Sequence, residues 1–378
     1  MLALSQEQEM LVTSLEDLAE GEFAKAAFEW DGEPPWENVE LLADRGFLGI
    51  NIDTEYGGGG MTEFDAMLSI EAVGRVCPDT AEFLYTQQMV APRAIEMFGT
   101  EATKERYLPP VTDGEDAIAI AISEPEAGSD VGSMDTRAEE DGDDLVVNGE
   151  KIWVSNVRES SAAVVWVKFP EGLGSLVVDL DADGVEIAQH YTNMAGHTQT
   201  QFYMENVRVP EENVLTRGKE GFKQQLQALN WERLGSATLA NAWGRCALDA
   251  ALEYAGTREQ FGEPIGDFQG IEWKLADMAT ELEASRALTY RAAVNAQERD
   301  RIPDRLDTSI AKLYASEMVE SVTSEALQIH GANGYQQGHP MEYLYRLARG
   351  RRLAAGTDEI QRNQIARALK KEGVPSLT

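Results

Sequence analysis

Two short segments of the chain carry side chains suited to holding a planar, heteroatom-rich ligand. The first is Ile120-Ala-Ile-Ser-Glu-Pro-Glu-Ala-Gly-Ser-Asp130, in which an apolar run breaks at Pro125 and closes on hydroxyl and carboxylate groups. Gly128 permits positive φ and a close approach of the backbone to a ligand. Neighbouring hydroxyls and free N–H groups suit a phosphate or a polar ring. This segment is therefore a candidate ligand-binding loop.

The second segment is Asn148-Gly-Glu-Lys-Ile-Trp-Val-Ser-Asn156. Trp153 and Ser155 are two residues apart, so their side chains share one face of a strand. A flat indole beside a hydroxyl can stack under a heteroaromatic ring and hydrogen-bond to its edge. The alternative is a Trp half-buried in a β core.

The elements that position these segments change type along the chain. Residues 5–116 show helical spacing, with one helix through residues 64–73 and a second over residues 80–98. From residue 117 to about residue 215 the pattern is that of strands. The apolar runs there lie at residues 145–147, 151–154, 162–167, 175–178 and 201–207. The first two flank Asn148-Gly149, which predicts a hairpin turn.

Helical spacing returns after Lys219. An apolar seam recurs at 3-4-3-4 spacing at Phe268, Ile271, Leu275, Met278 and Leu282. The next seam position is the polar Ser285, where we expect the apolar stripe to weaken. Other helices are expected at residues 222–256, 307–329 and 357–371.

The predicted fold is α+β with three consecutive domains. They are an all-α domain over residues 1–116, a β domain over residues 117–218 and a four-helix bundle over residues 219–378.

Composition excludes several classes of function. The net charge of −34, from 66 acidic and 32 basic residues, leaves no basic face for a nucleic acid. Dispersed acidity with few Lys is typical of proteins that work in high salt, where screening removes self-repulsion; an ordinary acidic protein is the alternative. No apolar run approaches the roughly 20 residues of a membrane span. The N-terminus has no basic segment followed by an apolar core, so we expect a cytoplasmic protein.

No metal site is expected. Cys77 and Cys246 are far apart in sequence, which predicts neither a disulfide framework nor a zinc site. The four His residues lack metal-ligand spacing and are interpreted as structural or surface residues.

The order of the two segments resembles the paired signatures of the acyl-CoA dehydrogenase flavoproteins. The matching residues are Ala121-Ile-Ser-Glu-Pro-Glu-Ala-Gly-Ser-Asp130 and Lys151-Ile-Trp-Val-Ser-Asn156. Further matches follow in the order of that family. They are Gly46-Phe-Leu-Gly49, Tyr56-Gly-Gly, Arg106-Tyr-Leu-Pro109, Arg258-Glu-Gln-Phe-Gly262, Phe268-Gln269, Gln328-Ile-His-Gly-Ala-Asn-Gly-Tyr335 and Gly356-Thr-Asp-Glu-Ile-Gln361. The resemblance covers essentially the whole chain and agrees with the α, β, α order.

The resemblance implies FAD held between the β domain and the bundle of a homotetramer, with its adenine end reaching a neighbouring subunit. Ser123 would contact the flavin ring, Trp153 would stack on it and Ser155 would reach its N5 edge. Arg258 would bind the pyrophosphate of the partner's FAD, for which a guanidinium fork is suited. Thr357 starts the last helix, where a polar cofactor segment fits.

The implied residue sets are larger than these examples. The cofactor-binding set is Ile120, Ile122, Ser123, Gly128, Ser129, Trp153, Ser155, Arg258, Gln260, Phe261, Phe268, Gln269, Gln328, Gly331, Ala332, Thr357 and Glu359. The substrate-binding set is Ser129, Asn230, Arg233 and Gly356, where Ser129 would lie near both the pyrophosphate and the pantetheine.

The implied activity is that of an oxidoreductase acting on a CH–CH group in fatty acid metabolism. A carboxylate removes the α-proton of an acyl-CoA thioester while the β-carbon loses a hydride to FAD, giving a trans-2-enoyl-CoA. Electrons then pass to an electron-transfer flavoprotein. Burial makes such a carboxylate a better base by raising its pKa.

Two positions depart from the usual pattern of the family. Ala332 replaces a second Gly, a small change. Ala355 replaces the commonest catalytic Glu, directly before Gly356-Thr357. Isovaleryl- and long-chain-type members instead carry the Glu on a bundle helix, just before an Arg. Leu229-Asn-Trp-Glu-Arg-Leu234 matches that arrangement, so Glu232 is the candidate base and Arg233 the candidate CoA ligand.

Small neighbours support this assignment. Gly235 and Ser236 leave room beside Glu232. Asp358 and Glu359 are competing carboxylates, but the first turn of a helix favours acids through its dipole alone. Ala354 and Ala355 together should widen the acyl pocket, which favours branched or bulky acyl groups.

Two other functions fit the same fold. One is a non-catalytic subunit that binds FAD or CoA within a hetero-oligomer. The other is a flavin oxidase or monooxygenase.

Overall fold

The computed structural model describes residues 4–30, 34–298 and 302–374 of the chain. The predicted domains therefore include residues outside the described ranges, at both ends of the chain and at residues 31–33 and 299–301. The chain forms two compact units, each assembled from separate stretches. Unit 1 contains Met1–Trp30, Met67–Glu82 and Glu232–Thr378, and unit 2 contains Asp31–Ala66 and Phe83–Trp231.

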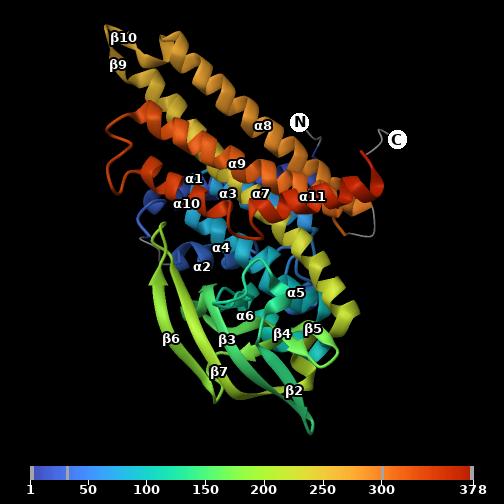
Figure 1. Cartoon of the computed structure of the whole chain (residues 1–378). Helices are drawn as coiled ribbons and strands as arrows, with labels where there is room; N and C mark the ends of the chain where they lie inside the picture. Colours follow the sequence, from blue (N-terminus) through green and yellow to red (C-terminus); the bar gives the residue numbers. More distant parts are fainter. Residues whose placement is uncertain (1–3, 31–33, 299–301, 375–378) are drawn as a thin grey trace. The chain divides into compact units, whose positions relative to one another are not determined.

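The N-terminal region is helical, as expected (Figure 1). Its α-helices are α1 (Gln6–Gly21), α2 (Trp36–Asp44), α3 (Glu63–Gly74), α4 (Pro78–Met89), α5 (Ala91–Phe98) and α6 (Glu101–Thr112). The prediction of one helix over residues 80–98 is wrong. Helix α4 ends at Met89, Val90 leaves the helical region (φ −116°, ψ −105°) and α5 starts with Pro92 in its first turn. Proline lacks the N–H that a continuous helix would need there.

The middle of the chain forms an eight-stranded sheet within the described residues. Its strands are β1 (Ala117–Ala121), β2 (Arg137–Asp141), β3 (Asp144–Ser155), β4 (Ser160–Phe169), β5 (Gly172–Asp179), β6 (Val185–Thr192), β7 (Thr198–Pro210) and β8 (Val214–Thr216). The order is β6-β7-β3-β2-β4-β5-β8, with β1 paired to β4 in parallel. The strand runs predicted at residues 162–167, 175–178 and 201–207 are confirmed as parts of β4, β5 and β7.

The hairpin predicted at Asn148-Gly149 is wrong, because β3 runs through both residues. The pairing with β7 shifts register between Val147 and Gly149, which marks a bulge. Gly149 has φ 155°, and a Cβ there would lie 2.4 Å from Thr136 Oγ1. Asn148 Oδ1 accepts a hydrogen bond from the Asn206 backbone N–H at 2.9 Å. The Asn-Gly pair therefore bends a long strand, while the actual turn lies between β2 and β3.

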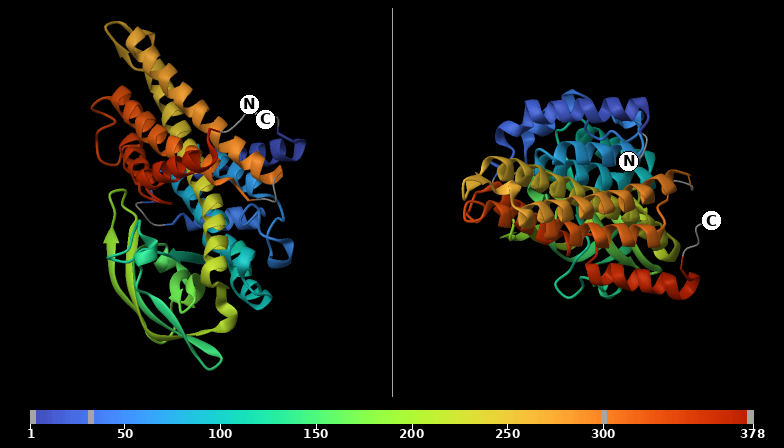
Figure 2. Two further views of the ribbon diagram at one scale, coloured as in Figure 1. Left: turned by 45° about the vertical axis from the view of Figure 1, so that its right-hand side comes forward. Right: turned by 90° about the horizontal axis from the view of Figure 1, so that it is seen from above.

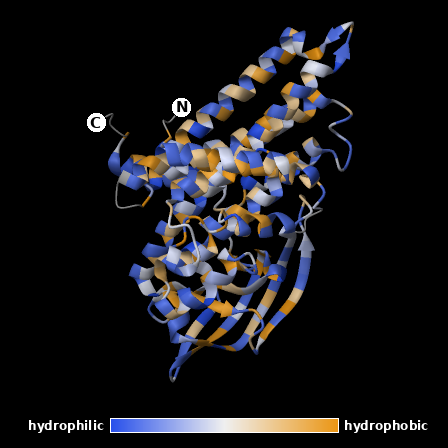
Figure 3. Ribbon diagram, turned by 180° about the vertical axis from the view of Figure 1, so that it is seen from behind, coloured by the Kyte–Doolittle hydropathy of each residue, from blue (hydrophilic) through white to orange (hydrophobic). Residues whose placement is uncertain are grey.

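Hydrophobic and hydrophilic residues alternate along the strands of unit 2, as the colours in Figure 3 show. The hydrophobic residues form apolar cores on the sheet. One apolar cluster includes Leu145, Val147, Val165, Phe202 and Val207, all fully buried. A second cluster packs residues of β1, β4 and β5 against α5 and α6. The strands that carry the candidate loop are thus anchored by two cores.

The C-terminal region forms the expected helical bundle. Its helices are α7 (Gly218–Thr257), α8 (Gln269–Glu298), α9 (Arg305–His330), α10 (Pro340–Arg351) and α11 (Asp358–Glu372), with a short hairpin of β9 (Glu259–Gln260) and β10 (Glu263–Pro264) after α7. Helices α8 and α9 lie side by side (Figure 2). No helix in the described ranges has both the length and the apolar character to cross a membrane.

The seam of α8 is buried at Met278 and Leu282 and continues through Ser285, which is 0% exposed. The Ser285 hydroxyl donates to Asn241 Oδ1 on α7 at 2.5 Å. We expected the seam to weaken at this position. A buried hydroxyl with a partner instead continues it as a polar contact.

Candidate functional site

The loop that follows β1 is held onto β3 by a buried ion pair. Lys151, 0% exposed, donates from Nζ to the carbonyl of Ile122 at 3.1 Å and to Glu124 Oε1 at 2.8 Å. The Ile152 N–H donates to the carbonyl of Ser123 at 3.0 Å. The backbone of Ser123 therefore has a defined position relative to β3.

Burial lowers the pKa of Lys151 to about 8, against the opposing effect of Glu124. Burial also disfavours the Glu124 carboxylate, but the N–H groups of Asp135 and Thr136 and the Lys151 ammonium lower its pKa overall. Both groups remain charged near neutral pH. Nothing local in the sequence indicates that these two residues meet.

Trp153 projects from β3 with 51% of its surface exposed, and Ser155 is exposed on the same face. A Trp that served only a β core would be buried. Its ring lies 4.9 Å from that of Tyr191. Trp153 also has φ 61°, a conformation that a bulky residue adopts at a cost and that concentrates at functional sites. Val154, between Trp153 and Ser155, is buried, as a common face of the two requires, although the pairing with β7 shifts register between Lys151 and Val154.

The remaining predicted residues of unit 2 surround this region to different degrees. Gly128 and Ser129 are exposed in the loop, and Ile122 packs against the cluster around Trp166. Ile120 packs against the core between the sheet and the helices. Asn230 is buried on α7, two residues before Glu232.

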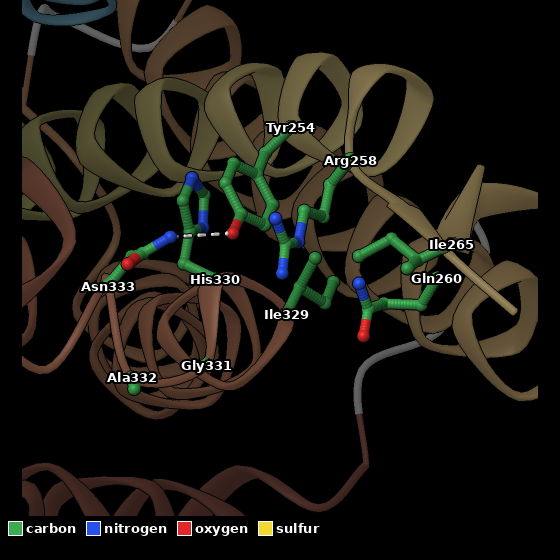
Figure 4. Close-up of a pocket in the computed structure, with 9 residues that line it drawn as sticks. All are labelled: Tyr254, Arg258, Gln260, Ile265, Ile329, His330, Gly331, Ala332 and Asn333. Atoms are coloured by element: carbon green, nitrogen blue, oxygen red, sulfur yellow. Dashed lines mark hydrogen bonds between the residues drawn. The ribbon is translucent and has the colours of Figure 1, made fainter.

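Unit 1 contains a pocket of about 300 Å³ at the ends of α7 and α9 (Figure 4). It is lined by Tyr254, Arg258, Gln260, Ile265, Ile329, His330, Gly331, Ala332 and Asn333. His330 stacks on Tyr254 with ring centroids 4.4 Å apart, and Asn333 Nδ2 donates to the Tyr254 hydroxyl at 2.9 Å. The structure thus brings together four of the predicted residues, Arg258, Gln260, Gly331 and Ala332.

Other predicted residues of this region lie outside the pocket lining. Gln328 and Gln269 are exposed, and Phe261 is 97% exposed with its ring 6.1 Å from that of Phe268. Five further residues line the pocket. Tyr254 and Ile265 lie outside the matching motifs, while Ile329, His330 and Asn333 belong to the motif at residues 328–335 but have no individual role assigned from sequence. His330 was interpreted as structural or on the surface. It is buried, and Tyr254 comes from a distant helix, so no spacing in the sequence indicated their stacking.

Glu232 lies on α7 at the start of the last segment of unit 1. Burial raises its pKa to about 7, while the positive charges of Arg233 and Arg351 oppose the rise. Within the described residues no hydrogen bond contributes to the pKa of its carboxylate, and no ion pair joins it to a basic side chain. An uncommitted carboxylate with a near-neutral pKa is suited to proton abstraction.

Arg233 is buried beside the corner between α10 and α11. Its Nε donates to the carbonyl of Ala355 at 3.2 Å, and a Cβ on Gly356 would lie 3.5 Å from Arg233 Nη2. Gln361 Nε2 donates to the carbonyls of Ala355 and Gly356, at 3.3 and 3.0 Å. Ala355 has φ 55°. Two of the predicted substrate-binding residues, Arg233 and Gly356, are therefore neighbours.

The competing carboxylates lie at the start of α11. Asp358 is 1% exposed and accepts hydrogen bonds from Ser316 at 2.6 Å, Arg352 at 2.7 Å and Lys312 at 3.3 Å. Glu359 is exposed, and hydrogen bonds from its own backbone N–H and from Thr357 lower its pKa. Thr357 caps α11 by accepting from the Ile360 N–H at 3.3 Å. Asp358 is therefore committed to three donors, and Glu359 has a lowered pKa, so neither resembles an uncommitted base.

Comparison with known proteins agrees with this arrangement along the whole chain. The model of the acyl-CoA dehydrogenase N-terminal domain matches residues 5–115, that of the middle domain matches residues 119–207 and that of the C-terminal domain matches residues 219–370. The chain belongs to the acyl-CoA dehydrogenase family. Oxidoreductase chemistry on a flavin is characteristic of this family, and the expected three-part fold is confirmed.

Individual members of the acyl-CoA dehydrogenase family resemble the chain over its length. The probable acyl-CoA dehydrogenase YngJ of Bacillus subtilis (strain 168) is 36% identical over 97% of this chain and 99% of its own. The caffeyl-CoA reductase-Etf complex subunit CarC of Acetobacterium woodii is 34% identical, again over 97% and 99%. The structure of butyryl-CoA dehydrogenase from Megasphaera elsdenii superimposes with a TM-score of 0.90 at 30% identity, covering 98% of this chain and 100% of its own.

Proposed function

We propose that the protein is an FAD-dependent acyl-CoA dehydrogenase that uses Glu232 as its catalytic base. The proposal depends chiefly on the raised pKa of the Glu232 carboxylate and on its lack of an ion-pair partner in the described residues. This pKa is raised to about 7, and the adjacent Arg233 contacts the Ala355–Gly356 backbone. Family members that lack Glu before Gly-Thr need a base elsewhere, and Glu232 meets the chemical requirement.

The residues present fit FAD. Trp153 offers an exposed ring beside the Ser155 hydroxyl, which suits a flavin face. The pocket of unit 1 contains the Arg258 guanidinium and no Asp or Glu among its lining residues. In a chain of net charge −34, a pocket lined without carboxylates favours an anionic ligand such as a pyrophosphate. When bound, FAD would supply the hydride acceptor for the β-carbon.

The proton chemistry belongs to the chain itself. Ionised Glu232 removes the α-proton of the acyl-CoA thioester, and its raised pKa makes it more basic than an ordinary carboxylate. Asp358 is held by three donors, and Glu359 has a lowered pKa, so both are weaker candidates. Arg233 and Gly356, which are neighbours in unit 1, would contact the CoA thioester. Asn230 and Ser129 are also proposed to bind the substrate.

The proposal also covers the oligomeric state, the electron acceptor, the acyl substrate and the cellular location. Phe261, 97% exposed, and Trp273, 62% exposed, leave apolar surface on unit 1 that a second copy of the chain would cover, as in a homotetramer. The resemblance to a subunit of a caffeyl-CoA reductase-Etf complex supports an electron-transfer flavoprotein as acceptor. Ala354 and Ala355 leave space that favours branched or bulky acyl groups. We also infer a cytoplasmic protein adapted to high salt.

Anaerobic reduction of the bound flavin by a panel of acyl-CoAs tests this function. Glu232→Gln should retain FAD and bind acyl-CoA, but its flavin should be reduced about 10²–10⁴-fold more slowly, since a positioned general base contributes a factor of that size. The control is Glu253→Gln, which neutralises an exposed carboxylate on the same helix. Full activity of Glu232→Gln would disprove the assignment of the base.

The same experiment distinguishes the other functions. A yellow protein that no acyl-CoA reduces would indicate a non-catalytic subunit. Rapid release of hydrogen peroxide in air would indicate an oxidase. Reduction by straight-chain substrates alone would contradict the inference of a widened pocket.

A further inference from the structure

Arg351, the last residue of α10, is held by two contacts inside unit 1. Its Nη2 lies 3.1 Å from Glu82 Oε1 on α4. Its guanidinium carbon lies 5.1 Å from the ring centroid of Trp243 on α7. The Arg351 side chain is only 11% exposed. Its charge therefore has a fixed position in the bundle.

The Arg351 guanidinium lies on the side of α7 that also carries Glu232. Trp243 follows Glu232 by eleven residues, which is close to three turns of an α-helix, so both side chains lie on one face. Helical side chains lean toward the N-terminus, and the indole of Trp243 thus leans toward Glu232. Trp243 is fully buried, and its Nε1 donates to the carbonyl of Pro78 at 3.4 Å. An Arg placed over this ring lies above the face that carries the base.

The charges around Glu232 come from several elements. Arg233 of α7 and Arg351 of α10 both favour its ionised form. Lys312 of α9 is affected by both arginines, but its own charge is offset by its partner Asp358 of α11. Arg305 of α9 acts on Arg233. Glu82 of α4 adds a negative charge next to Arg351.

Arg351 forms its ion pair with Glu82 and not with Glu232. Within the described residues, no ion pair joins Glu232 to any Arg or Lys, whereas Arg351 is paired to Glu82. A direct pair with Arg351 would occupy the Glu232 carboxylate and make it a weak base. The anchored Arg351 instead acts through space.

We propose that Arg351, anchored by Glu82 and Trp243, is a positioning residue that stabilises the ionised carboxylate of Glu232 without binding it. Glu82 moderates this effect, because its negative charge partly cancels that of Arg351. The inference rests on the proposed function of Glu232 and deepens it. Burial disfavours the charged carboxylate, and Arg351 supplies part of the compensation that keeps Glu232 ionisable near neutral pH.

The test compares the pH dependence of flavin reduction in three variants of the FAD-loaded protein. Arg351→Met removes the positive charge, so the acidic limb of the rate profile should move to higher pH by about one unit. Arg351→Lys keeps the charge and should leave the limb near that of the unmodified protein. Glu82→Gln keeps a hydrogen-bond acceptor for Arg351 but removes its counter-charge, so the limb should move to lower pH.

The opposite directions separate an electrostatic role from packing. The proposal would be overturned if the acidic limb shifted equally in Arg351→Met and Arg351→Lys. It would also be overturned if the limb shifted in the same direction in Arg351→Met and Glu82→Gln.

A second measurement does not depend on activity. The protonated Glu232 carboxyl absorbs in the infrared. Subtracting the spectrum of the same variant that also carries Glu232→Gln isolates this absorption, and its pH dependence gives the titration midpoint of Glu232 directly. An unchanged titration midpoint in Arg351→Met would refute the role of Arg351 and leave that of Glu232 intact. Full activity of Glu232→Gln would refute the base, while the infrared titration would still report on Arg351.

Discussion

At the scale of single residues, the chemistry depends on a carboxylate whose surroundings favour its neutral form. Burial raises the pKa of Glu232, and two arginines limit the rise, so that the group changes protonation near pH 7. The base must be ionised to accept a proton. Activity is therefore expected to fall as the pH drops below about 7, with Glu232 as the titrating group.

The same pKa makes a prediction about stability. The folded state holds the Glu232 proton more tightly than the unfolded state, so ionisation of Glu232 destabilises the fold progressively from its ordinary pKa of 4.5 up to about 7. Glu232→Gln removes this cost. Chemical denaturation measures the free energy of unfolding of Glu232→Gln relative to the unmodified protein. This difference should grow in favour of the variant by about 2 kcal/mol between about pH 5 and about pH 8. Glu253→Gln should show no such pH-dependent gain, and an equal gain in both variants would contradict the prediction.

At the scale of elements, β3 organises the candidate flavin face. It carries the Gly149 bulge, the buried Lys151 that holds the loop, and the exposed pair Trp153 and Ser155. The bulge brings the backbone against Thr136, which only a residue without Cβ allows. One strand thus positions both the loop and the ring that would face a cofactor.

Gly149→Ala tests the role of the bulge. The new Cβ would lie 2.6 Å from Thr136 Cα at a backbone φ of 155°, so backbone atoms must move. We expect a loss of about 3 kcal/mol in the free energy of unfolding, together with weaker retention of FAD. Gly132→Ala is the control, because its Cβ would meet only Asp130 Oδ1 at 3.5 Å. Similar stabilities of the two variants would show that the bulge tolerates a side chain.

At the scale of the whole molecule, acids outnumber bases by 66 to 32. Some bases are shared by several acids. Arg217, for example, forms ion pairs with Glu140, Glu171 and Glu211, whose side chains are all substantially exposed. Exposed pairs contribute little individually, and the remaining carboxylates repel one another. Screening by salt should reduce that repulsion more than it weakens the pairs.

Thermal unfolding as a function of salt measures this balance. We expect Tm to rise by at least about 5 °C between about 0.2 M and about 2 M KCl. Sucrose of matched water activity is the control, because it stabilises without screening. A Tm that falls with KCl would contradict an adaptation to high salt.

The sequence alone determined what depends on local periodicity and on ordered motifs. The two-residue spacing of Trp153 and Ser155 predicted a shared face, because the period of a strand is two, and both side chains are exposed with the buried Val154 between them. The 3-4 spacing similarly predicted α8, and the absence of Glu at position 355 directed attention to Glu232. Local signals failed where one pattern serves two geometries: Asn148-Gly149 suits a hairpin turn and equally a bulge within a long strand.

Only the tertiary structure decided which distant residues meet. Glu82 and Arg351 are 269 positions apart, and Tyr254 and His330 come from different helices, so no spacing could indicate either contact. The pKa of Glu232 is likewise a consequence of packing: burial raises it, and the nearby charges of Arg233 and Arg351 limit the rise. Motifs specify which groups a site contains. Their protonation and freedom from partners follow from the surrounding charges and enclosed volume, which exist only once the chain has folded.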